Sequence, residues 1–344
     1  MKNQCHKTKE MSPMDSMIAH EISSETGIRD IQLLVTDEVP TSIGHGSKKC
    51  RMFSGVTRSG TEAVIKAAFL NTESSNEISN NFGSYLLAME HGVNLFPGII
   101  EFYIVPLRPN HKVVAEVLFL AMERAGTPVY RYLERSEHPM KVYDSLYGQL
   151  YATYEKTLSH DPPAGRLFIE RRFTDLERYF GGHLKDAGFS GDEEMGKILA
   201  LRHRLLSLRI ESVALTTGGE MDAVHVFFSK EGKVTLIDPK PPEQMMGFPQ
   251  HDLAIFGTLV KEVYHLRDGD YGYQKAKETA RRVGSLQGIS QEISDALFII
   301  GEIRLLATAA RFRVGVHDDL ARKYADMAKQ KLNQLYYSSL ERQL

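Results

Sequence analysis

A carboxylate ends an expected β-strand in the middle of the chain, within the segment EGKVTLIDPKPP. Asp238 follows the alternating run 233–237, and Pro239 comes directly after it. Aspartate is rare inside strands, and proline has no N–H to donate to a sheet. A strand that stops in this way leaves a carboxylate fixed at its end, so we expect Asp238 to be used at a functional site.

Three more polar side chains precede Asp238 at short distances along the sequence. His225 lies thirteen residues before it, Glu220 lies five residues before His225, and Asp222 stands between these two. The segment AVHVFFSKEGKVTLIDP is typical of a β-hairpin, because a Gly-containing turn separates two apolar runs. The two ends of such a hairpin would bring the residues near 225 and 238 together. These four side chains are therefore the candidates for chemistry in the second half of the chain.

The first half of the chain offers a lysine and a glutamate. Lys66 lies on the expected strand EAVIKAAF, and Glu77 lies early in the helical stretch that follows. Ser74 and Glu77 have the spacing of a helix capping box, so Glu77 also has a purely structural interpretation. Glu73, one turn earlier, is an alternative to Glu77 as a functional glutamate.

The elements that must position these residues are segregated along the sequence. Three runs with strand patterning come first, IQLLV, CRMFSGVT and EAVIKAAF, and two more follow the helical stretch, EFYIVPL and KVVAEVLFLAM. Gly44 and Gly46 lie between the first two runs, where such a pair usually forms only a hairpin turn. The short Gly/Pro linker ERAGTP ends this strand-rich part.

Beyond the linker the pattern is helical, apart from the hairpin. In ISDALFIIGEIRLLATAA the apolar residues from Ile293 to Ala310 recur at helical spacing, and Ser290 is placed to cap the helix. Strands first and helices afterwards indicate an α+β fold rather than alternating βαβ units. We predict a polar, poorly ordered tail at residues 1–28, a β-rich lobe at 29–125 and a helical lobe at 126–344.

Composition limits the class of protein. The 344 residues are 42 % hydrophobic and 25 % charged with a net charge of −2, an ordinary globular balance without the basic excess of a nucleic-acid-binding protein. Two cysteines suit a reducing cytoplasm, and no apolar run is long enough to span a bilayer. The arginine pairs at 171–172 and 281–282 are interpreted as solvated faces. The sequence leaves the oligomeric state open.

The residues from 216 to 257, TTGGEMDAVHVFFSKEGKVTLIDPKPPEQMMGFPQHDLAIFG, carry a family resemblance. They resemble the protein-kinase-like superfamily, and within it the small-molecule kinases of the aminoglycoside phosphotransferase type. That family has a catalytic loop written His-Gly-Asp-x-x-x-x-Asn, a hairpin, a metal-binding Asp often within Ile-Asp-Pro, and then a His/Tyr-Asp-Leu-Ala segment. The resemblance extends over roughly residues 30–260 and implies a bilobal fold with a β-rich N-lobe and a mainly helical C-lobe.

The resemblance implies a role for each candidate in the binding of ATP and Mg²⁺. Asp238 would hold the metal ion on the ATP phosphates, Lys66 would contact the α- and β-phosphates, and Glu77 would orient Lys66. The turn at Gly44 and Gly46 would cover the phosphates. The segment 121–124, with Glu123, would be the hinge that binds adenine. Glu220 would be the catalytic base, and Asp252 would be a buried acceptor that supports the catalytic loop.

The catalytic loop departs from the family at three positions. Gly218 stands where the family has its histidine, Glu220 where it has aspartate, and His225 where it has the second metal ligand, asparagine. Glutamate can still accept a proton, and His225 can ligate a metal ion, although Mg²⁺ prefers oxygen. His225 could instead contact a phosphate or orient Asp238, and Asp222 could be the base if the loop is shifted.

The resemblance therefore implies a phosphotransferase that moves the γ-phosphate of ATP to a hydroxyl of a small molecule such as an antibiotic, sugar or nucleoside. Two alternatives stay open. A protein Ser/Thr kinase is one, although the stretch after Asp238 is short for an activation segment. The other is a pseudokinase-like module that binds a nucleotide and transfers little or nothing, which the three departures in the loop favour.

Overall fold

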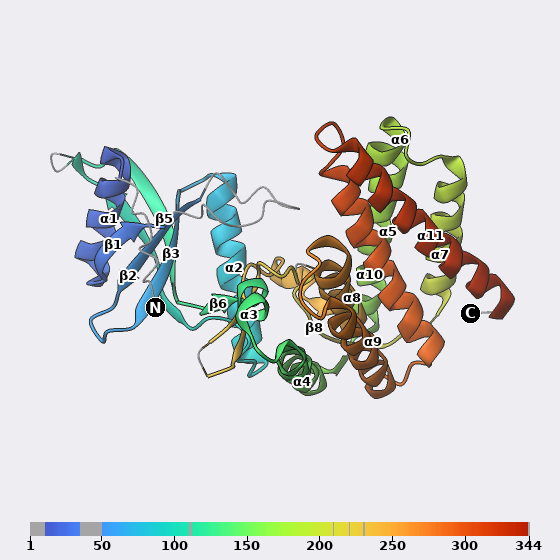
Figure 1. The fold of residues 1–344 in the computed structure, drawn as a ribbon. Helices are drawn as coiled ribbons and strands as arrows, with labels where there is room; N and C mark the ends of the chain where they lie inside the picture. Colours follow the sequence, from blue (N-terminus) through green and yellow to red (C-terminus); the bar gives the residue numbers. More distant parts are fainter. Residues whose placement is uncertain are drawn as a thin grey trace. The chain divides into compact units, whose positions relative to one another are not determined.

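The computed structural model describes most of the chain and divides it into two compact units. The described residues are 11–34, 50–109, 112–208, 210–219, 221–229 and 231–342. The division falls after Gly126, one residue beyond the predicted lobe boundary. Three predicted site residues, Gly44, Gly46 and Glu220, lie outside the described residues. Each unit is treated by itself below, with the labels of Figure 1.

The first unit is built on one antiparallel sheet. Its strand order is β1-β2-β3-β5-β4, and every neighbouring pair is antiparallel. The strands are β1 (Arg29–Leu33), β2 (Arg51–Val56), β3 (Glu62–Phe69), β4 (Ile99–Leu107) and β5 (Ala115–Glu123). Each overlaps one of the five runs read from the sequence, with ends that differ by up to three residues. Figure 1 shows the sheet between helices α1 and α2.

Helix α1 (Pro13–Thr26) corrects the prediction of a poorly ordered tail. Ser12 caps its first turn by accepting a hydrogen bond from the Asp15 N–H. Ile18 and Ile22 are fully buried in the cluster that covers one face of the sheet. Their i, i+4 spacing gives a narrow apolar stripe in an otherwise polar segment, and composition alone concealed it.

Helix α2 (Glu73–Glu90) begins differently from the prediction. Its N-cap is Thr72, which forms the capping box with Ser75, so the predicted pair Ser74–Glu77 is wrong. Tyr85 on this helix is buried, whereas Met89, one turn later, is 61 % exposed. Glu77 therefore does not cap the helix, because Thr72 and Ser75 complete the cap without it.

The second unit is mainly helical, and its largest described apolar cluster draws on helices between Phe168 and Leu335. In chain order the helices are α3 (Val129–Arg135), α4 (Pro139–Thr157), α5 (Pro162–Arg178), the π-helix η2 (Tyr179–His183), α6 (Leu184–Asp186), α7 (Asp192–Ser207), the 3-10 turn η3 (Pro242–Gln244), α8 (Pro249–Thr258), the π-helix η4 (Leu259–Val263), α9 (Gly269–Leu286), α10 (Gln291–Arg311) and α11 (Asp318–Arg342). Ser290 caps α10 by accepting from the Ile293 N–H, as predicted. None of the helices in the described ranges is long and apolar enough to cross a membrane.

Two small sheets complete the second unit. The predicted hairpin is confirmed as β9 (Val226–Phe228) and β10 (Val234–Leu236), and β6 (Thr127–Pro128) extends it. A second sheet joins β7 (Ser159–His160), β8 (Ser212–Leu215) and β11 (Met246–Gly247). The sequence did not reveal these last three strands, because two to four residues are too few for a two-residue period to show.

Candidate functional site

The hairpin brings the residues near 225 and 238 together, as predicted. Val226 pairs with Leu236, and the Ile237 N–H donates to the His225 carbonyl oxygen at 2.9 Å. Asp238 is the next residue, so it leaves the hairpin beside the point where His225 enters it. The pairing register therefore decides which side chains meet at this end of the hairpin.

Asp238 has an unusual backbone conformation. Its φ is +53°, in the left-handed region, and its side chain is half-buried. For a residue other than glycine this conformation costs about 1–2 kcal/mol, and such residues cluster at functional sites. Two residues later the Lys240 N–H donates to the Thr217 carbonyl oxygen at 3.0 Å. The segment after Asp238 is thus tied to the loop that precedes the hairpin.

That loop turns sharply at two glycines. Gly218 and Gly219 have φ values of +69° and +89°. A Cβ at Gly218 would lie 2.6 Å from the Cβ of Lys240 and 3.0 Å from the Gln244 carbonyl oxygen. There is no room for a side chain there, so a histidine at this position would collide with Lys240 and with the Gln244 carbonyl group.

Asp252, on helix α8, holds the loop from below. Its carboxylate is fully buried and accepts from the Thr217 N–H at 2.6 Å, the Thr217 hydroxyl at 2.8 Å and the Gly219 N–H at 2.9 Å. Burial raises the pKa of Asp252 above its ordinary value, while these hydrogen bonds and the charge of Arg172 act in the opposite direction. The buried acceptor predicted at this position is confirmed.

Two arginines hold the same loop through its carbonyl groups. Arg172 on α5 donates to the Gly218 oxygen at 2.8 Å, and Arg304 on α10 donates to the Gly219 oxygen at 3.2 Å. Both also contact the carboxylate of Asp175, at 3.3 and 3.0 Å. Arg172 is only 3 % exposed, so its interpretation as part of a solvated face is wrong. The role of Arg172 could not be recognised from its sequence neighbours, because the Gly218 carbonyl group that it holds lies far along the chain.

His251, next to Asp252, is buried without hydrogen bonds. Neither ring nitrogen has a partner among the described residues, and its ring packs edge-on against Phe168. Burial lowers its pKa well below the ordinary value, and Arg172 and Arg304 lower it further. The imidazole is therefore neutral beneath the loop.

Asp222 is engaged in the local structure of the loop. Its carboxylate accepts from the Val224 N–H at 3.1 Å and from the Tyr264 hydroxyl at 3.0 Å. Its carbonyl oxygen accepts from the His225 N–H at 2.9 Å. These bonds make Asp222 the cap of a turn that leads into β9, which is a different task from that of a base.

In the first unit, Lys66 contacts an amide in place of the expected glutamate. Lys66 is 5 % exposed and donates to the Asn81 Oδ1 at 2.9 Å. Among the described residues there is no hydrogen bond or ion pair between Lys66 and Glu77. Asn81 lies one helical turn after Glu77, on the same face of α2. A polar residue on the buried face between Ile78 and Tyr85 was the signal that could have identified it.

Glu123 lies on the other face of the sheet from Lys66. Lys66 pairs with Leu120, and successive residues of a strand alternate between faces, so Glu123 points the opposite way. The N–H groups of Glu123 and Arg124 already donate to the carbonyl oxygens of Gly98 and Glu62, at 2.8 and 3.0 Å. These two donors of the expected hinge are therefore in use within the unit.

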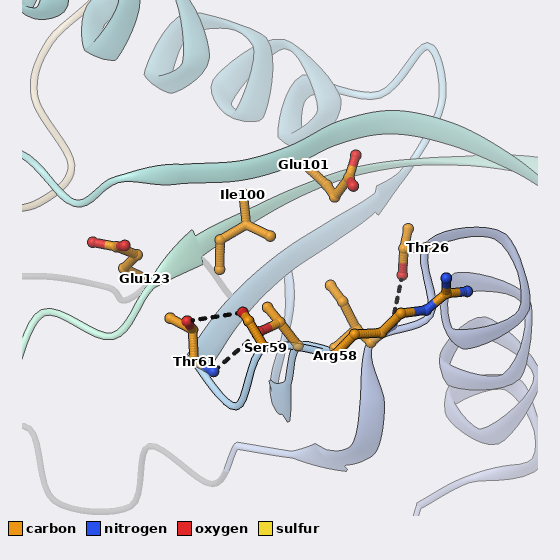
Figure 2. Close-up of a pocket in the computed structure, with 9 residues that line it drawn as sticks. Thr26, Arg58, Ser59, Thr61, Ile100, Glu101 and Glu123 are labelled. Atoms are coloured by element: carbon orange, nitrogen blue, oxygen red, sulfur yellow. Dashed lines mark hydrogen bonds between the residues drawn. The ribbon is translucent and has the colours of Figure 1, made fainter.

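Glu123 instead lines a cavity of about 340 Å³ in the first unit. Figure 2 shows Ile100 between the carboxylates of Glu123 and Glu101, with the turn before β3 facing them. In that turn the Thr57 hydroxyl bonds to the Ser59 hydroxyl at 2.8 Å and accepts from the Thr61 N–H at 3.0 Å. The hydroxyl groups of this turn therefore already form hydrogen bonds within the cavity wall.

A preformed metal cage is absent from the part of the chain that the structure describes, where no three His, Cys, Asp or Glu side chains converge. Mg²⁺ does not need one, because it is commonly held by one or two carboxylates together with substrate phosphates. The oxygen donors of Asp238 fit that requirement. The nitrogen donors of His225 do not, which favours the phosphate-contacting or orienting role considered for His225.

Comparison with known proteins identifies the fold. No protein-family model matches the sequence, and no curated protein matches it significantly. The structure is similar to that of the amicoumacin kinase hAmiN in complex with AMP-PNP, Ca²⁺ and Ami, with a TM-score of 0.51 and 13 % identity over 93 % of each chain. It is also similar to choline kinase from Cryptosporidium parvum Iowa II, with a TM-score of 0.50 and 10 % identity over 95 % of this chain and 97 % of that one. The chain therefore has the protein-kinase-like fold that the segment 216–257 predicted.

Proposed function

We propose that the protein transfers the γ-phosphate of ATP, with Mg²⁺, to a hydroxyl of a small molecule such as an antibiotic, sugar or nucleoside. The observation that carries this proposal is the placement of Asp238. It leaves the hairpin in a left-handed conformation, beside His225 and next to a loop that Asp252 fixes by three hydrogen bonds. The similar amicoumacin kinase, solved with a nucleotide analogue and a divalent cation, gives further support.

Each residue has one task in this proposal. Asp238 holds the metal ion, which when bound neutralises charge on the transferred phosphoryl group. Glu220 accepts the proton of the acceptor hydroxyl, and Lys66, oriented by Asn81, contacts the α- and β-phosphates. Asp222 is the weaker candidate for the base, because Tyr264 and the turn already use its carboxylate. Positioning and charge stabilisation supply most of the catalysis in reactions of this kind.

The short segment after Asp238 supports a small-molecule acceptor over a peptide. Helix α8 begins at Pro249, and the intervening residues form only the turn η3 and the two-residue strand β11. A peptide substrate would need an extended surface to bind along, and this segment is too short to supply one.

The test is Mg²⁺-dependent turnover of ATP in the wild type, Asp238→Ala and Glu220→Ala, with nucleotide binding measured separately by calorimetry. We expect activity to fall by about 10²-fold or more in each variant, the scale of a lost charge-stabilising or acid–base group. Arg166→Ala, on the exposed side of α5, is the control that should retain activity.

A second candidate is a nucleotide-binding module without transfer. The steric exclusion of a side chain at Gly218 favours it, because the loop cannot regain the family's histidine. Nucleotide binding without turnover, unchanged in Glu220→Ala, would establish that candidate and refute the kinase.

A further inference from the structure

Four arginines line the face where α5 and η2 pack against α10, and we call them the arginine strip. They are Arg172, Arg178, Arg304 and Arg311. The Asp175 carboxylate contacts three of the four, Arg172, Arg178 and Arg304. Apart from Asp175, the described residues provide no carboxylate within 4.0 Å of Arg178 or Arg311, so positive charge gathers at their end of the strip in a chain whose net charge is −2.

The strip starts at the loop of the proposed base. Arg304 donates to the Gly219 carbonyl oxygen at 3.2 Å, and Gly219 directly precedes Glu220. From Arg304 the strip follows α10 for seven residues to Arg311. At 1.5 Å per residue this is a rise of about 10 Å, within the length of a small acceptor molecule.

The far end of the strip lies around the ring of Tyr179. The guanidinium groups of Arg178 and Arg311 stand 5.2 and 5.8 Å from the ring centre. Arg178 also contacts Asp175 at 3.1 Å, with a side chain that is 58 % exposed. Arg311 has no carboxylate within 4.0 Å among the described residues. One cation at this end is therefore without a counter-charge, and its neighbour is accessible to solvent.

Titration of the neighbouring groups agrees with a positive potential here. Burial and the charge of Asp175 raise the pKa of Tyr179. A hydrogen bond with Thr308 and the charges of Arg304 and Arg178 lower it more, so the pKa of Tyr179 lies below its ordinary value. Partial burial lowers the pKa of His183, and Arg311 and Arg178 lower it further, while Asp186 raises it.

The backbone at the far end is irregular and leaves space. Residues 179–183 form a π-helix, a local widening that often marks functional sites. A Cβ built on Gly182 would meet no atom within 4 Å. The surface beside Gly182 is therefore not covered by another side chain.

We propose that the acceptor is an anionic small molecule, whose carboxylate or phosphate is bound by Arg178 and Arg311 while its hydroxyl lies at Glu220. This inference rests on the proposed function. In the reaction the acceptor oxygen forms a bond to the γ-phosphorus, and the bond from that phosphorus to the β,γ-bridging oxygen breaks. ADP leaves with that oxygen and its electron pair, and the hydroxyl proton passes to the Glu220 carboxylate.

The first experiment measures binding without nucleotide, by calorimetry, with glucose 6-phosphate, gluconate, glucose and glucosamine. We expect saturable binding of at least one anionic probe and weaker or no binding of glucose and glucosamine. Arg178→Ala and Arg311→Ala should each lower the affinity for the anionic probe by about 10-fold or more, as expected for a lost hydrogen bond between charged groups. Arg166→Ala, the same change on the helix that carries Arg178, should leave binding unchanged.

Several results would overturn the inference. One is that neither anionic probe binds, and another is that glucosamine binds best. A third is that Arg178→Ala and Arg311→Ala lower the melting temperature of the protein without lowering its affinity for the anionic probe. In that case the two arginines serve only as cations at the C-terminal turns of α5 and α10.

A second experiment separates this inference from the proposed function. Transfer from ATP to each probe is followed in the wild type, Arg311→Ala and Asp238→Ala. Anion binding that survives in Asp238→Ala, with no transfer in the wild type, would refute the kinase and keep the anion site. Transfer to glucosamine that Arg311→Ala leaves unchanged would keep the kinase and refute the anion site.

Discussion

The loop before the hairpin in the second unit and the lysine strand of the first unit hold their polar groups by different means. The loop at residues 216–219 has no regular structure and is fixed by Asp252, Arg172 and Arg304, which come from three separate helices. Lys66 lies in a regular ladder between β2 and β5 and has the amide of Asn81 as a partner. The loop therefore depends on tertiary partners for its shape, whereas the strand fixes Lys66 through its own pairing.

The largest effect should come from Asp252→Ala, which removes the main support of the loop. The change leaves the N–H groups of Thr217 and Gly219 without this acceptor and removes one of the negative charges near Arg172, which keeps its contact with Asp175. We expect a loss of about 3–5 kcal/mol in the free energy of unfolding, as for other buried charges that lose a partner. Urea denaturation measures it. The exposed Asp326→Ala should leave the midpoint nearly unchanged, and an equal shift in both would contradict the role of Asp252.

Gly218→Ala should cost about 3 kcal/mol, by strain and by collision. Its φ of +69° already disfavours a side chain, and the new Cβ would meet the Cβ of Lys240 at 2.6 Å. Gly188 is a matched control, because it has a φ of +73° and open space around it, so Gly188→Ala should cost only about 1 kcal/mol. Equal losses in the two variants would show that the loop can move away from Lys240.

His251 should make the loop sensitive to acid. Its pKa in the folded protein lies well below the ordinary 6.5, so the unfolded chain takes up the proton first as the pH falls. Its contribution to stability is complete above about pH 6.5 and declines below that by about 1.4 kcal/mol per pH unit. Unfolding of the wild type and His251→Leu between pH 7.5 and 5.5 measures this, and the variant should have the shallower slope. An identical slope would mean that His251 does not titrate on unfolding.

The smallest effect is expected on the strand side. Asn81→Ala removes one hydrogen bond from the Lys66 ammonium and should weaken nucleotide binding by about 10-fold, the scale of a hydrogen bond to a charged group. Glu77→Ala should change it less than about 2-fold, since Glu77 does not contact Lys66. Calorimetry with ATP and Mg²⁺ measures both affinities. A larger loss of affinity in Glu77→Ala than in Asn81→Ala would show that Glu77 is the partner of Lys66, as predicted from the sequence.

The same contrast explains what the sequence could and could not predict. Lys66, Asp238 and the hairpin follow from local alternation and from the turn residues, so their places could be read directly. Arg172 and Asn81 gain their roles from partners that only the folded chain brings close. Asp252 was recognised because its HDLA segment resembles a known motif, and not because of any local pattern. The order of the elements predicted the fold, whereas the support of the loop required the structure.

Helix α1 has a practical consequence for anyone who shortens this chain. Ile18 and Ile22 cover Phe53 and Phe119 on one face of the first unit's sheet. A fragment that starts at residue 29 would present those rings to water, and sheets with an uncovered apolar face tend to self-associate. Loss of activity in such a fragment would then report aggregation and say nothing about catalysis.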